Sequence, residues 1–174
     1  MGFHHVAITT RDCLASHRFY SECMGFELAK VEVGPCGKTG FAKHLFYDTG
    51  DGTMMAIWDL HDDGLPEEWP TGIATGLSLP IWTNHIAFQA RDLADLERRR
   101  ERWLTHGVGV MEVDHGWCHS IYARDPNDVM VEFCTSTRVL NAADRDEALA
   151  LLHDPAPTIG AAATPIFHRP EAKS

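Results

Sequence analysis

Two histidines occupy matching places in two short stretches of the sequence. His5 lies in "FHHVAI", residues 3–8, and His85 lies in "NHIAF", residues 84–88. Each polar imidazole stands in an otherwise apolar segment, where a single histidine is usually a packing or edge residue. A neutral imidazole is also a frequent metal ligand, and near neutral pH it can accept or release a proton. Two histidines in equivalent segments favour a shared metal or acid–base site.

The segments that carry these histidines belong to an internal duplication with an offset of 80 residues. "HHVAITTRD" at 4–12 falls on "NHIAFQARD" at 84–92, and "VEV" at 31–33 falls on "MEV" at 111–113. Self-similarity at a fixed offset indicates repeated structural units. In both copies an apolar strand leads into "RD", which is typical of a turn followed by a helix start.

Each copy predicts the element order β-α-β-β-β, which belongs to the α+β class. Helices are expected at 13–23 and 93–106, ended by Gly25 and Gly107. Further strands are expected at 27–33, 42–47, 54–58, 109–113, 118–123 and 129–134. We predict a first module at 1–59, a Pro- and Gly-rich linker at 60–82, a second module at 83–135, and a C-terminal extension at 136–174 with a short helix at 142–152.

Composition excludes several classes of partner. The chain has 174 residues and a formal charge of -10, so it lacks the basic surface that a nucleic acid or an anionic membrane requires. No segment approaches the roughly 20 apolar residues that cross a bilayer. Five cysteines in no CxxC spacing fit neither a disulfide framework nor a zinc knuckle. We expect a cytoplasmic protein with reduced thiols.

The duplicated strands with their histidines, together with the closing "SIYARDPNDVMVEF" at 120–133, resemble the vicinal oxygen chelate superfamily. This superfamily includes glyoxalases, bleomycin- and fosfomycin-resistance proteins and extradiol dioxygenases. The resemblance covers roughly the first 135 residues. It implies that two tandem βαβββ modules form a curved mixed-sheet cup around a divalent metal.

The resemblance places the metal ligands at His5, His85 and Glu132. Side-chain alternation along a strand agrees, because it puts each histidine on a face with small neighbours and turns Glu132 away from the apolar Val131. A buried carboxylate needs a cation or donors to offset its charge. Two histidines and one carboxylate leave coordination positions open, which suits Fe(II), with Mn(II) as the alternative. His4 has the opposite parity and is expected to be a surface or packing residue.

Three further residues resemble active-site positions of the extradiol enzymes. His44 in "AKHLFY" corresponds to a histidine near the substrate ring, and His115 in "DHGWCHSIY" corresponds to another active-site histidine. Tyr122 lies ten residues before Glu132, where extradiol and fosfomycin enzymes carry a tyrosine, although it can also be a core aromatic. A histidine can take a phenolic proton and return it during ring cleavage.

Ala56 narrows the choice of reaction. It occupies the position in the first module that corresponds to Glu132, where glyoxalase I and methylmalonyl-CoA epimerase use a fourth ligand. We therefore expect an extradiol-like dioxygenase that cleaves a catechol or other vicinal diol with O2. Two alternatives remain: another metal-dependent reaction on this scaffold, such as fosfomycin-resistance-like addition or isomerisation, and a metal-free protein that sequesters a ligand.

The extension predicts a homodimer. Its apolar segment "AAATPIF" at 161–167 has no place in a two-module core, so we expect it to cover the cup or sheet edge of a second copy. The end of the tail is expected to lack fixed structure.

Overall fold

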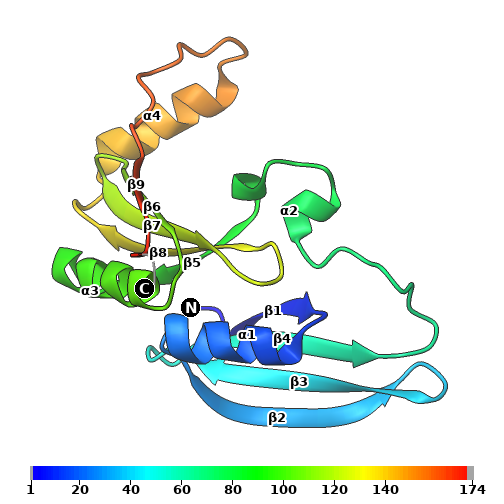
Figure 1. The fold of residues 1–174 in the computed structure, drawn as a ribbon. Helices are drawn as coiled ribbons and strands as arrows, with labels where there is room; N and C mark the ends of the chain where they lie inside the picture. Colours follow the sequence, from blue (N-terminus) through cyan, green and yellow to red (C-terminus); the bar gives the residue numbers. More distant parts are fainter. Residues whose placement is uncertain (1, 172–174) are drawn as a thin grey trace.

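Two consecutive βαβββ modules form most of the computed structural model, which describes residues 2–171 (Figure 1). The end of the tail at 172–174 lies outside the described residues, as does residue 1. The first module comprises β1 (His5–Thr10), α1 (Cys13–Arg18), η1 (Phe19–Cys23), β2 (Glu27–Cys36), β3 (Gly40–Asp48) and β4 (Met54–His61). The second comprises β5 (His85–Gln89), α3 (Leu93–Thr105), β6 (Val110–Asp114), β7 (Cys118–Arg124) and β8 (Met130–Ser136). The predicted element order is confirmed.

The helix predicted at 13–23 begins as an α-helix and continues as the π-helix η1. The Asp12 side chain begins it by accepting a 2.8 Å hydrogen bond from a backbone N–H one turn later. Further along, the Met24 N–H donates to the Phe19 carbonyl at 2.9 Å, which is the five-residue spacing of a π-helix. Gly25 has a φ of 78° and ends the helix, in a conformation that glycine adopts at little cost.

The strands form two separate mixed sheets. The first sheet has the order β1-β4-β3-β2 and the second has the order β5-β8-β7-β6-β9. In each module the first and last strands pair in parallel, and the remaining neighbours pair antiparallel. The sequence predicts one cup; within a single chain the two sheets remain open instead of closing around a common cavity. The expected modules are present, but their relation to each other differs from the expectation.

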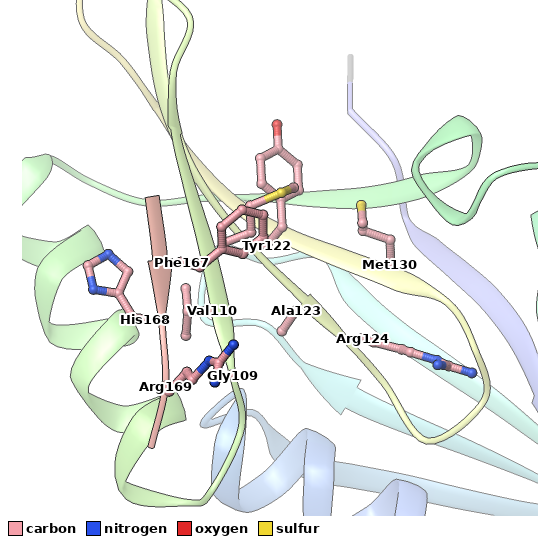
Figure 2. Close-up of a pocket in the computed structure, with 10 residues that line it drawn as sticks. Gly109, Val110, Tyr122, Ala123, Arg124, Met130, Phe167, His168 and Arg169 are labelled. Carbon is pink, nitrogen blue, oxygen red and sulfur yellow. The ribbon is translucent and has the colours of Figure 1, made fainter. Parts of the chain in front are cut away.

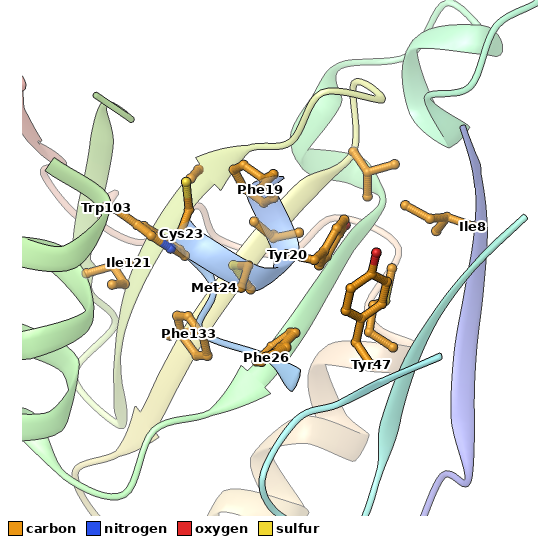
Figure 3. Packing of buried hydrophobic residues seen from close by; sticks show 14 of the residues in the cluster. Ile8, Phe19, Tyr20, Cys23, Met24, Phe26, Tyr47, Trp103, Ile121 and Phe133 are labelled. Carbon is orange, nitrogen blue, oxygen red and sulfur yellow. The ribbon is translucent and has the colours of Figure 1, made fainter. Parts of the chain in front are cut away.

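One hydrophobic core joins the two sheets and explains this arrangement. Figure 3 shows Phe19 and Tyr20 of η1, with Met24 directly after it, lying between strands of both modules. Trp103 of α3 and Phe133 of β8 are fully or almost fully buried in the same cluster. Because the helix-covered face of each sheet packs into this core, the opposite face of each sheet points away from it. These opposite faces are called the open faces below.

The linker and the extension add elements outside the modules. The linker holds the short helices α2 (Ile73–Gly76) and η2 (Ile81–Thr83), and the extension holds α4 (Ala142–His153) and β9 (Ile166–His168). No residue of α4 is buried. No helix within residues 2–171 is long and apolar enough to span a membrane.

The apolar tail segment at 161–167, expected to lie outside the two modules, ends on the second sheet. Its last two residues enter β9, which pairs antiparallel with β6 of the same chain. The side chain of His168 reinforces this pairing, since its Nε2 lies 2.7 Å from Glu112 Oε2. An unpaired edge of β6 is available to this chain's own tail, which explains the difference.

Candidate metal centre

His85 and Glu132 meet on the open face of the second sheet. Parallel pairing of β5 with β8 aligns His85 with Met130 and Ala87 with Glu132, so all four side chains share one face. His85 Nε2 lies 3.2 Å from Glu132 Oε2. Glu132 is only 5% exposed, whereas the His85 side chain is 41% exposed and opens the pair to solvent.

The hydrogen bonding of His85 determines which ring nitrogen faces Glu132. His85 Nδ1 lies 3.1 Å from the carbonyl oxygen of Trp82, which can only accept, so Nδ1 carries the hydrogen. His85 Nε2 therefore faces the Glu132 carboxylate at 3.2 Å, and either a proton on Nε2 or a bound cation can join the two groups.

Tyr122 and His115 extend this group. Tyr122 of β7 pairs with Glu132 of β8, and His115 Nε2 lies 3.0 Å from the Tyr122 hydroxyl. Burial, together with the negative charge of Glu132, raises the pKa of Tyr122 to about 12. The hydroxyl is therefore protonated at neutral pH and can donate one hydrogen bond while accepting another.

His5 lies on the open face of the first sheet, with a different set of neighbours. His4 Nδ1 and His5 Nδ1 are 2.8 Å apart, so one ring donates to the other. The ring centroid of His5 is 6.1 Å from that of His44 and 5.6 Å from that of Phe46. His4, expected to be only a surface or packing residue, therefore contacts the candidate ligand directly. No carboxylate is recorded beside His5 in the described part of the chain.

His44 is buried among aromatic side chains. Its ring stacks on Trp58 with 3.7 Å between centroids and contacts Phe46 at 4.0 Å. His44 is 9% exposed, and its Nε2 has no hydrogen-bond partner among the described residues. Burial, and then the neighbouring His5, lower the pKa of His44. The neutral imidazole is thus favoured, with Nε2 buried and unpaired among the described residues.

Strand register confirms that Ala56 corresponds to Glu132. Ala7 pairs with Ala56 in the first sheet, and Ala87, which is equivalent to Ala7 in the duplication, pairs with Glu132 in the second. Phe46 pairs with Ala56 in the first sheet, and Tyr122 pairs with Glu132 in the second. Phe46 is therefore the counterpart of Tyr122. The first module has no carboxylate at this position.

The sequence-predicted site residues fall into two groups within one chain. His85, Glu132, Tyr122 and His115 lie together on the second sheet, while His5 and His44 lie together on the first. Among residues 2–171, no three His, Cys, Asp or Glu side chains are close enough together to hold a metal ion. The donor set fits a divalent cation in type, with two donors on the second sheet and the third on the first.

Sequence reasoning did not identify the aromatic residues around His44 or the role of Glu112. Trp58 and Phe46 could have been found from the alternation of β3 and β4, which puts both on the face of His44. Glu112 binds His119 Nε2 at 2.8 Å, besides Arg100 and His168. No spacing in the sequence indicates this cluster, because its members come from four separate elements.

Comparison with known proteins agrees with the fold. The model of the glyoxalase/bleomycin resistance protein/dioxygenase superfamily matches residues 2–133. A glyoxylase/bleomycin resistance protein/dioxygenase domain from Frankia sp. EAN1pec has a TM-score of 0.57 at 20% identity, with 78% of this chain and 98% of that chain covered. A search of curated proteins finds no match.

Two further solved structures share the fold. A lactoylglutathione lyase from Agrobacterium tumefaciens has a TM-score of 0.51 at 20% identity, covering 76% of this chain and 92% of that chain. A glyoxalase/bleomycin resistance protein from Streptomyces sp. CB03234 has a TM-score of 0.53 at 15% identity, covering 77% of this chain and 100% of that chain. Because the family model spans both modules and both histidine-bearing strands, this chain belongs to the glyoxalase/bleomycin resistance protein/dioxygenase superfamily.

Proposed function

We propose that this protein is a metal-dependent enzyme of the vicinal oxygen chelate type that cleaves the ring of a catechol, or another vicinal diol, with O2. The contact between His85 Nε2 and Glu132 Oε2 carries the proposal. A buried carboxylate beside an imidazole lone pair is costly unless a cation or proton lies between them. The exposed side of His85 gives a metal and a substrate access to that position.

His85, Glu132 and His5 would hold the metal, with Fe(II) favoured and Mn(II) as the alternative. When bound, such a metal polarises two vicinal oxygens of a substrate and supports one-electron chemistry with O2. Tyr122 orients one substrate oxygen through its protonated hydroxyl, and His115 fixes the direction of that hydroxyl. His44 accepts a substrate proton at Nε2, which is buried and without a partner in the described structure.

We propose that a second copy supplies the third donor. His5 and the pair of His85 with Glu132 lie on open faces that point away from the shared core, so one chain does not bring them together. Pairing the first sheet of one copy with the second sheet of another would create two equivalent sites in a homodimer. The exposed leucines of α4, at 149, 151 and 152, are candidates for additional dimer contacts.

Mixing two inactive variants tests the shared site. In a dimer of His5→Ala with Glu132→Ala, one site carries both lesions and the other carries neither. Random pairing should therefore restore about a quarter of the parental Mn(II) sites. Binding that stays at the level of the separate variants, or a chain that is monomeric at micromolar concentration, would contradict the dimeric site.

The reaction itself requires a separate experiment. The protein should be purified without oxygen, analysed for metal, loaded with Fe(II), and given a panel of catechols while oxygen uptake is recorded. Glu132→Gln serves as the control because it keeps the size of the side chain and removes its charge. Metal binding without cleavage of any catechol would leave an addition or isomerisation as the reaction, since those need no O2.

A metal-free ligand-sequestering protein is the second candidate. It is favoured by one observation: within residues 2–171 no three donors gather in one chain. Absence of Fe(II) and Mn(II) binding in the parent protein would select this alternative. We also propose a cytoplasmic location, because all five cysteines are free and a reducing compartment preserves thiols.

A further inference from the structure

A pocket of about 380 Å³ lies beside Tyr122 on the second sheet, and the C-terminal extension forms one of its walls. Figure 2 shows Tyr122, Met130 and Phe167 around this pocket, with Arg124 and Arg169 farther from Tyr122. The volume falls within the range of small-molecule sites. Phe167 and Arg169 belong to the extension, beyond the residues 2–133 that match the family model.

Strand register connects this pocket to the candidate metal centre. Glu132 pairs with Tyr122, Tyr122 pairs with Met111, and Met111 pairs with Phe167, which makes one row across four strands. Adjacent strands are about 4.8 Å apart, so the row extends roughly 14 Å from Glu132 to Phe167. A ring held near Glu132 would therefore direct a substituent past Tyr122 toward Phe167.

β9 is held firmly enough to make Phe167 a fixed wall. Glu112 of β6 contacts His168 Nε2 at 2.7 Å and also binds Arg100 at 2.9 Å. Burial alone would raise the pKa of Glu112, but hydrogen bonds from Arg100 and the two histidines outweigh it and lower that pKa. Phe167 nevertheless remains 69% exposed on this anchored strand, which leaves its ring free to contact a ligand.

The charge along the pocket favours an anionic group. Its lining includes Arg124 and Arg169 and no carboxylate. Arg124 binds Asp128 through Nε and Nη2, so the carboxylate of Asp128 offsets its charge. No ion pair of Arg169 is recorded among the described residues. Arg169 therefore contributes a positive charge to the pocket wall, in a chain whose formal charge is -10.

We propose that this pocket binds the substituent of the substrate, that the substituent is apolar and ends in a carboxylate, and that Phe167 limits its size. The inference rests on the proposed function only in calling the occupant a substrate. Met111, Met130 and Phe167 contact the apolar part, and the guanidinium of Arg169 binds the carboxylate.

Two simple probes test the pocket without the metal. 3-Phenylpropionate and 3-phenyl-1-propanol share one apolar body and differ in charge, and neither carries vicinal oxygens. Calorimetry of the full chain should detect the acid binding at least about fivefold more tightly than the alcohol. Arg169→Gln should weaken binding of the acid about two- to fivefold and leave the alcohol unchanged. Arg145→Gln, on exposed α4, is the matched control.

Substitutions in β9 test the wall. Phe167→Ala should lower the affinity for both probes about tenfold. The affinity of Phe167→Leu should lie between those of Phe167→Ala and the parent protein. Ile166→Ala is the control because Ile166 is the neighbouring residue of opposite parity in the same strand. Equal binding of acid and alcohol would overturn the anionic substituent, and equal losses in Phe167→Ala and Ile166→Ala would overturn the role of Phe167. Both results can be obtained without metal. A parent protein that binds no metal would instead contradict the proposed function.

Discussion

The two modules share one fold and one register, yet their open faces carry different chemistry. In the second module, Glu132 pairs with Tyr122 and contacts His85. At the corresponding positions of the first module, Ala56 pairs with Phe46, and His5 contacts aromatic rings instead of a carboxylate. Both modules have the same strands and a histidine in the first strand, whereas only the second module has a carboxylate and a hydroxyl at these positions.

The two modules therefore offer different chemical groups to a ligand. The second module offers a carboxylate, an imidazole and a hydroxyl, which suit a cation and polar substrate atoms. The first offers His44 stacked on Trp58, an apolar surface with one available nitrogen. A site built from both open faces would combine the charged groups of the second module with the aromatic groups of the first. Variants in each module test whether the two sets of groups act together.

The largest effect is expected for His44→Gln. Loss of a general base costs about 100- to 10,000-fold in rate, so this variant should keep metal and substrate binding but lose most turnover. The lowered pKa of His44 means that the base stays neutral down to a pH below its ordinary value of about 6.5. The acidic limb of the parental pH profile of turnover should therefore lie below the ordinary histidine pKa of about 6.5. This limb should be flatter in His44→Gln.

His119→Gln is the control for this experiment, because His119 contacts Glu112 away from the open face. If His44→Gln turns over as fast as the parent while a catechol is cleaved, the aromatic groups of the first module have no acid–base role. His115 or Tyr122 would then be the next residue to test.

The second effect concerns the metal ligands. His5→Ala, His85→Ala and Glu132→Ala should each reduce the free energy of Mn(II) binding by roughly 3 kcal/mol or more, given about 10 kcal/mol or more for a well-formed site. Titration calorimetry measures this, with exposed Glu101→Gln as the control. If only His5→Ala kept the parental Mn(II) affinity, the metal site would belong to the second module alone, and the first module would not contribute a ligand.

Much of this comparison was predictable from the sequence, because it depends on local rules. Strand alternation and the duplication suffice to predict that His85 and Glu132 share a face and that Ala56 corresponds to Glu132. The relation between the sheets was not predictable, since it depends on how η1 packs between them. The sequence did not predict that β9 pairs with β6, because a strand of three residues is too short to show a periodic pattern.

Ala56→Glu should have the third largest effect, on stability. Ala56 is fully buried, so a carboxylate there would lack a cation, and we expect a loss of about 2 to 4 kcal/mol of unfolding free energy in chelator. Urea denaturation measures the loss, and Ala7→Glu, at the exposed partner position, is the control. Mn(II) should recover part of the loss if the first sheet joins the metal site. A variant as stable as the parent in chelator would show that this position tolerates charge.

The smallest effect is expected for Tyr122→Phe, which gives the second module the residue that the first carries as Phe46. The variant loses the hydroxyl contact with His115, so kcat/KM should fall about fivefold, equivalent to roughly 1 kcal/mol, without a change in metal affinity. Because the pKa of Tyr122 is raised to about 12, its hydroxyl stays protonated throughout the working range, and the parental profile should have no basic limb from this residue. Tyr47→Phe is the control, since Tyr47 lies in the core near His17 and its loss should alter stability but not turnover. A basic limb below pH 10 that disappears in Tyr122→Phe would instead identify a tyrosinate, and the hydroxyl would then be a base rather than a donor.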